Sequence, residues 1–165
     1  MQTPEPSKIH RYTKYDFPWF RYIPGRGIHP SKMIGKEHIP EIQETGNEFS
    51  DKTWQRSIHF LYAIDLFNAG YYWEVHEVLE KLWIKQGKDS TEGQFLQGLI
   101  QLSVALLKKE QGNLTGVRRL SEKFLPKLEN QHETYLGINV TKLFAEFKKH
   151  IENNTLAPVI VLEFN

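Results

Sequence analysis

The segment from residue 91 to residue 111 constrains the fold more than any other part of the chain. Its spacing is helical, yet its apolar side chains lie nearly all round the helix: Phe95, Leu96, Leu99, Ile100, Leu102, Val104, Ala105, Leu106 and Leu107. A helix that is apolar on every side has to be covered on every side. We therefore expect a central buried helix over residues 91–111, with the other elements arranged around it.

Glycine and asparagine residues divide the flanking sequence into further helices. The predicted helices span residues 50–68, 71–86, 113–129 and 139–153. Links as short as Ala69-Gly70 and Gly112 make neighbouring helices antiparallel hairpins. The two hairpins repeat faintly at an offset of 42 residues, in the manner of tetratricopeptide repeats. The sequence predicts an all-α fold, a compact bundle of about five helices.

Residues 1–49 differ in composition from the helical remainder. They hold six of the eight prolines, interleaved with aromatic residues: Tyr12, Tyr15, Phe17, Trp19, Phe20 and Tyr22. Such aromatic density is unlike that of a disordered tail. We expect residues 1–49 to form an extended strap that packs on a helical body, residues 50–165, within a single domain.

Charge and cysteine content exclude several classes of function. The chain has no cysteine, which excludes disulfides, thiolate metal ligands and cysteine nucleophiles and is typical of a reducing compartment. The net charge is +1, and a modest basic excess in residues 1–40 is expected to lie on the acidic body, so nucleic-acid binding is not favoured. No signal peptide or membrane-spanning run is recognisable. We expect a cytoplasmic protein without a membrane segment.

Two ionisable residues lie on a face of the predicted helix 71–86 that should be apolar. On a helical wheel His76 and Glu80 follow the apolar arc directly and are flanked by Trp73 and Trp83. The residues left to face solvent are Glu74, Glu77 and Lys81. The placement of His76 and Glu80 among tryptophans marks this face as the candidate functional site.

Asp65 belongs to the same hypothesis, because it interrupts the core stripe of the preceding helix. An antiparallel hairpin brings Asp65 and His76 to a similar level, which predicts a cluster of Asp65, His76 and Glu80. A buried charge without a partner costs roughly several kcal/mol. Three explanations follow. The cluster is a satisfied structural network, a metal site for iron, manganese or zinc, or a metal-free pocket that binds a small polar ligand or uses Glu80 and His76 as acid and base.

Weaker candidates surround this cluster. Glu77 is a further catalytic candidate, while His29, Gln97 and Gln101 are candidates for the pocket wall together with the two tryptophans. The zincin motif is absent, because the residue four positions after His76 is Glu80 and not a second histidine. Two functions stay open: a metal-dependent, hydrolase-like activity, or a non-enzymatic protein-interaction module in which the cluster is structural. The apolar tail, residues 159–162, either packs on the body or forms a homodimer contact.

The motif as a whole resembles a known family. Phe67-Asn68-Ala69-Gly70 precedes Trp73, His76-Glu77, Leu79-Glu80 and Trp83, and Gln97-Gly98-Leu99-Ile100-Gln101 follows. These residues are similar to the family called domain of unknown function 309, and the strap from Phe17 to Pro30 resembles the segment before the helices in its longer members. The resemblance implies a compact all-helical fold and no particular activity. His38 lies where the similarity to longer members is only partial.

Overall fold

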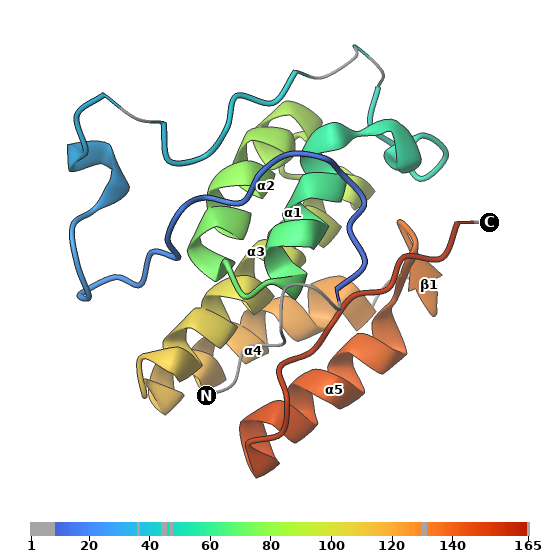
Figure 1. Ribbon diagram of the computed structural model, residues 1–165. Helices are drawn as coiled ribbons and strands as arrows, with labels where there is room; N and C mark the ends of the chain where they lie inside the picture. Colours follow the sequence, from blue (N-terminus) through green and yellow to red (C-terminus); the bar gives the residue numbers. More distant parts are fainter. Residues whose placement is uncertain (1–8, 36, 44–45, 47, 130–131, 165) are drawn as a thin grey trace.

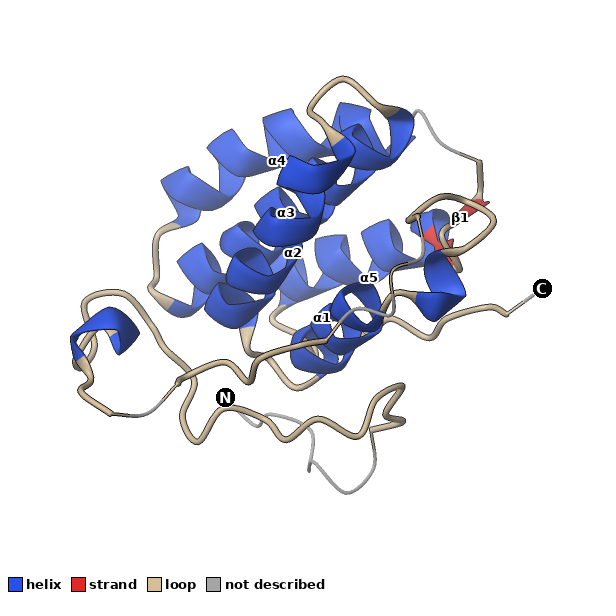
Figure 2. Ribbon diagram, turned by 90° about the horizontal axis from the view of Figure 1, so that it is seen from above, coloured by secondary structure: helices blue, strands red, loops and turns tan. Residues whose placement is uncertain are grey.

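The computed structural model describes residues 9–35, 37–43, 46, 48–129 and 132–164, and it confirms the all-α prediction (Figures 1 and 2). The helices of the described part are α1 (Ile58–Asn68), α2 (Tyr72–Gln86), α3 (Thr91–Glu110), α4 (Leu114–Glu129) and α5 (Val140–Asn153). Two short 3-10 helices, η2 (Pro30–Lys32) and η3 (Trp54–Arg56), precede them. Strands β1 (Thr134–Tyr135) and β2 (Ile138–Asn139) form a small antiparallel hairpin before α5, which the sequence did not predict.

Helix α3 is the central helix, as predicted from the apolar side chains that lie nearly all round it. Figure 2 shows it in a layer between α4 and α2, and its contacts are made mainly with these two helices. Gly98 lies where α3 packs against α4: a Cβ atom there would be 2.7 Å from Cδ2 of Leu128. The glycine therefore allows α4 to pack directly against the α3 backbone.

Helix ends follow the glycine and asparagine positions closely, but the start of α1 differs from the prediction. Asn139 caps α5 through its side-chain oxygen, and Gly87 follows the end of α2 with φ +83°. Helix α1 begins only at Ile58, because Ser57 has an extended backbone and its hydroxyl accepts from the Phe60 amide. The predicted start near residue 50 is replaced by turns and by η3.

The chain before α1 crosses the outside of α1 and α2 as an extended segment, drawn in blue in Figure 1. Phe17 stacks on Tyr71 of the body with centroids 5.2 Å apart, and Tyr22 is buried, whereas Trp19 is 64% exposed. The Tyr62 hydroxyl donates to the Asp16 carbonyl over 2.8 Å. The predicted strap spans residues 1–49; from here on the name refers to its described residues between 9 and 43.

The C-terminal tail packs on the helical body, which is one of the two alternatives considered for it. Ile160 and Leu162 are buried, and the Asn68 side chain both donates to and accepts from the Ile160 backbone. The Leu162 amide donates to the Tyr12 hydroxyl, so the tail also touches the strap. Among the described residues, no helix has the length and apolar character needed to cross a membrane.

Candidate functional site

Helix α2 brings His76, Glu77 and Glu80 together on one side. One ligand atom from each residue lies within 4.8 Å of the other two. His76 Nδ1 is 3.2 Å from Glu77 Oε1, and His76 Nε2 is 3.9 Å from Glu80 Oε2. The imidazole thus lies between two carboxylates. The three side chains are between one third and under one half exposed, so the group is open to solvent and to a ligand.

The electrostatics of this group agree with its geometry. The contact with the Glu77 carboxylate raises the pKa of His76 above its ordinary value, and the same contact lowers the pKa of Glu77. Burial opposes both shifts but is outweighed. An imidazole between two carboxylates therefore attracts positive charge, whether a proton or a metal ion supplies it.

Both tryptophans of the motif lie beside the group on α2. Trp73 is half-buried under the strap, with its ring 5.0 Å from Tyr22 and 5.4 Å from His29. Trp83 is half-buried, and its indole Nε1 is a buried donor without an acceptor in the part of the chain that the structure describes. Residues three apart share a helix face, so this donor belongs to the side of α2 that carries Glu80.

Asp65 is buried as predicted, but the structure does not bring it to His76 and Glu80. Its carboxylate accepts from the backbone amides of Tyr12 and Thr13, at 2.7 and 2.9 Å, and from the Thr13 hydroxyl at 2.6 Å. Arg11 Nε lies 3.2 Å away. The hydrogen-bond acceptors of Asp65 are thus used by the strap. The third member of the group with His76 and Glu80 is Glu77 and not Asp65.

The helical wheel predicted that Glu74 faces solvent, and this prediction was wrong, because Glu74 is fully buried. Its Oε1 accepts from the Tyr22 amide at 2.8 Å and lies 2.7 Å from His38 Nε2, while its Oε2 has no partner among the described residues. Burial raises the pKa of Glu74, although both hydrogen bonds oppose the shift. The strap covers this side of α2, which the period of the helix alone does not reveal.

The remaining candidates are dispersed. His29 packs on Tyr22 and Trp73 and accepts from the Ser31 amide at Nδ1, and its charge contributes to the lowered pKa of Glu77. Gln101 accepts from Lys127 at 3.0 Å, so its amide is directed to α4. Gln97 is half-buried on α3. Among the described pocket candidates outside α2, His29 is the one whose charge acts on the group.

The fold and the site define a class: an all-helical domain with a His-Glu-Glu group on its second helix. Residues 60–120 match the model of the family DUF309, a domain of unknown function, which confirms the resemblance over this segment. The match includes the candidate group and the Gln97-Gly98 motif and leaves the strap outside. No protein with a curated description matches the chain.

Proposed function

We propose that His76, Glu77 and Glu80 bind a divalent metal ion. The observation that carries this proposal is the mutual distance of the three ligand atoms, within 4.8 Å on one helix. One imidazole and two carboxylates are a donor set that suits zinc, manganese or iron. The raised pKa of His76 and the lowered pKa of Glu77 support it, because the same field that favours a proton on the imidazole favours a cation in its place.

The partial exposure of the group separates this proposal from a purely structural network. A network that only satisfies buried groups is exemplified by Asp65, which is inaccessible to solvent and has its acceptors filled by the strap. The three residues on α2 are accessible, and their main partners are one another. They can therefore take a ligand without any rearrangement of the core.

A metal ion held by three side chains keeps coordination positions for water and a further ligand, as in catalytic and not in structural sites. A metal-dependent hydrolase is therefore the enzyme class to assay first. The alternative, an interaction module, needs no metal and predicts that metal binding is absent.

The test is calorimetric titration of the metal-free protein with Zn²⁺ and Mn²⁺, together with elemental analysis of protein purified without a metal-affinity step. We expect one equivalent of metal, with the affinity reduced about tenfold or more in His76→Ala, Glu77→Gln and Glu80→Gln. Glu152→Gln is the matched control, because Glu152 is an exposed carboxylate in an i,i+4 pair on α5. Affinity should fall with decreasing pH from above 6.5, since the raised pKa makes the proton a competitor.

Equal affinities in the three α2 variants and the control would refute the proposal. So would the absence of stoichiometric metal in protein from metal-supplemented cells.

A further inference from the structure

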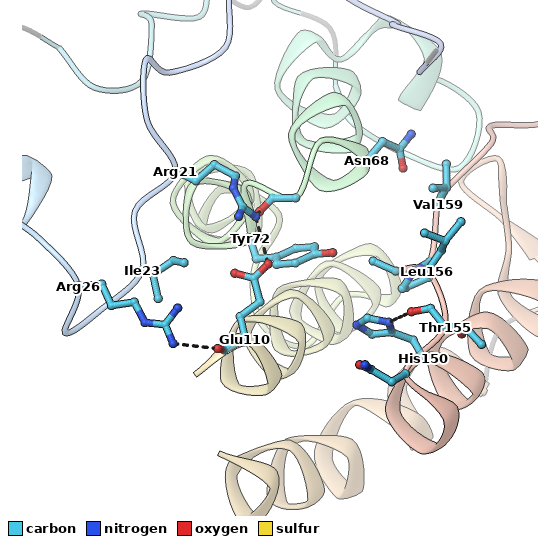
Figure 3. A pocket seen from close by; sticks show the side chains of 14 residues that line it. Arg21, Ile23, Arg26, Asn68, Tyr72, Glu110, His150, Thr155, Leu156 and Val159 are labelled. Carbon is cyan, nitrogen blue, oxygen red and sulfur yellow. Dashed lines mark hydrogen bonds and ion pairs between the residues drawn. The ribbon is translucent and has the colours of Figure 1, made fainter. Parts of the chain in front are cut away.

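A cavity lies where the strap, the ends of α3 and α5 and the C-terminal segment meet. The cavity has a volume of about 460 Å³. It is lined by Arg21, Ile23 and Arg26 of the strap, by the α1–α2 turn with Tyr72, by the ends of α3 and α5, and by residues 154–159, which follow α5 and lead into the tail (Figure 3). None of the proposed metal ligands lines it. Its volume falls within the range, about 300 to 1,000 Å³, that is usual for small-molecule sites.

His150 supplies a fixed acceptor in the cavity wall. The side chain is only 5% exposed, and its Nδ1 lies 2.7 Å from the Thr155 carbonyl. A carbonyl oxygen only accepts, so Nδ1 carries the proton and the neutral ring presents the lone pair of Nε2. Burial lowers the pKa of His150, which keeps the ring neutral. In Figure 3 the Nε2 edge points away from Thr155 and toward the space beside Tyr72. A ligand there has to donate a hydrogen bond.

Tyr72 adds a hydroxyl on the other side of the same space. It is 4% exposed and lines the cavity. Burial, with the Glu110 carboxylate as a further cause, raises the pKa of Tyr72, so the hydroxyl stays protonated. Two nearly buried polar side chains thus line one cavity.

The charges around the cavity do not cancel. Arg21 neutralises Glu110, with 3.0 Å between Nη1 and Oε1. Arg26 contacts only the Glu110 backbone carbonyl, at 3.2 Å, and has no carboxylate partner among the described residues. The surplus positive charge at Arg26 favours an anion.

The tail supplies the apolar side of the cavity. The apolar lining residues on this side are Leu156, Ala157, Pro158 and Val159. Ile23 of the strap lies opposite them. Leu156 is 72% exposed. A carbon skeleton bound in the cavity would cover this surface.

We infer that the cavity binds a small organic anion that carries a hydroxyl donor, of the hydroxycarboxylate class. Its carboxylate pairs with Arg26, its hydroxyl donates to Nε2 of His150, and its carbon chain lies on the Leu156 wall. This inference is independent of the proposed metal site.

The test uses three matched probes: 3-hydroxybutyrate, butyrate without the hydroxyl, and 1,3-butanediol without the carboxylate. Binding is measured by calorimetry and by the ¹⁵N shifts of the histidine rings. The wild type should bind 3-hydroxybutyrate about tenfold more tightly than either analogue, because each analogue leaves one polar group of the site unpaired. Arg26→Met should abolish the preference over the diol, and His150→Phe the preference over butyrate. Arg118→Met, an exposed arginine on α4, is the control and should change neither.

Equal binding of the three probes, no binding of 3-hydroxybutyrate, or unchanged preferences in Arg26→Met would each overturn the inference. If His150→Phe does not fold, the wild-type ring shifts decide instead. Nε2 of His150 has to move more with 3-hydroxybutyrate than with butyrate, and equal shifts would refute its role.

Discussion

Replacement of Asp65 by alanine tests a buried polar contact between the strap and α1. Asp65 is inaccessible to solvent and accepts three hydrogen bonds from Tyr12 and Thr13, with Arg11 beside it. Removing the carboxylate takes away the acceptor of these two backbone amides. The strap must then either leave its donors unpaired or move away from α1.

The expected loss is about 3–5 kcal/mol in the free energy of unfolding, the range for removing one partner of a buried ion pair. The loss cannot exceed the free energy by which the strap binds to the body. If the strap detaches, Tyr12 and Thr13, which are only partly buried, form hydrogen bonds with water instead. Thr13→Val is the matched control, since it removes the hydroxyl alone and should cost about 1 kcal/mol.

Urea unfolding followed by tryptophan fluorescence measures the loss, and limited trypsin digestion reports on the strap at Arg21 and Arg26. We expect Asp65→Ala to lower the unfolding midpoint and to accelerate cleavage at both arginines. A loss below about 1 kcal/mol together with unchanged cleavage would refute the reasoning, because the carboxylate would then not hold the strap.

Two further predictions concern α2 and α3. Because burial raises the folded-state pKa of Glu74 above its ordinary value of 4.5, the native state keeps a proton that the unfolded chain releases. Wild-type stability should therefore fall as the pH rises from 4.5 through the folded-state pKa, whereas Glu74→Gln should lack this slope. Urea midpoints across this range measure it, and identical profiles would contradict it. Gly98→Ala should destabilise by about 1–3 kcal/mol in thermal unfolding, because the new Cβ meets Leu128 at 2.7 Å. Leu128→Val in the same chain should recover part of this loss, and an additive loss would exclude the steric explanation.

Much of the helical architecture was determined locally and was therefore readable from the sequence. Gly70, Gly87 and Gly112 have positive φ and separate α1 to α4 at the predicted places. The apolar circumference of α3 predicted its central position. His76 and Glu80 also meet as predicted, because an i,i+4 spacing fixes their proximity within one helix.

Only the tertiary structure decided the partners of the buried acids. Asp65 and Glu74 are both charged residues on helices of the body, but each accepts from strap amides about 50 positions away in the sequence. The helical wheel placed Glu74 in solvent, and the antiparallel hairpin placed Asp65 beside His76. Neither argument contains information about what covers a helix face. Helical periodicity is set by contacts between near neighbours, whereas the path of a strap without a regular period depends on side chains that meet only after the helices have packed.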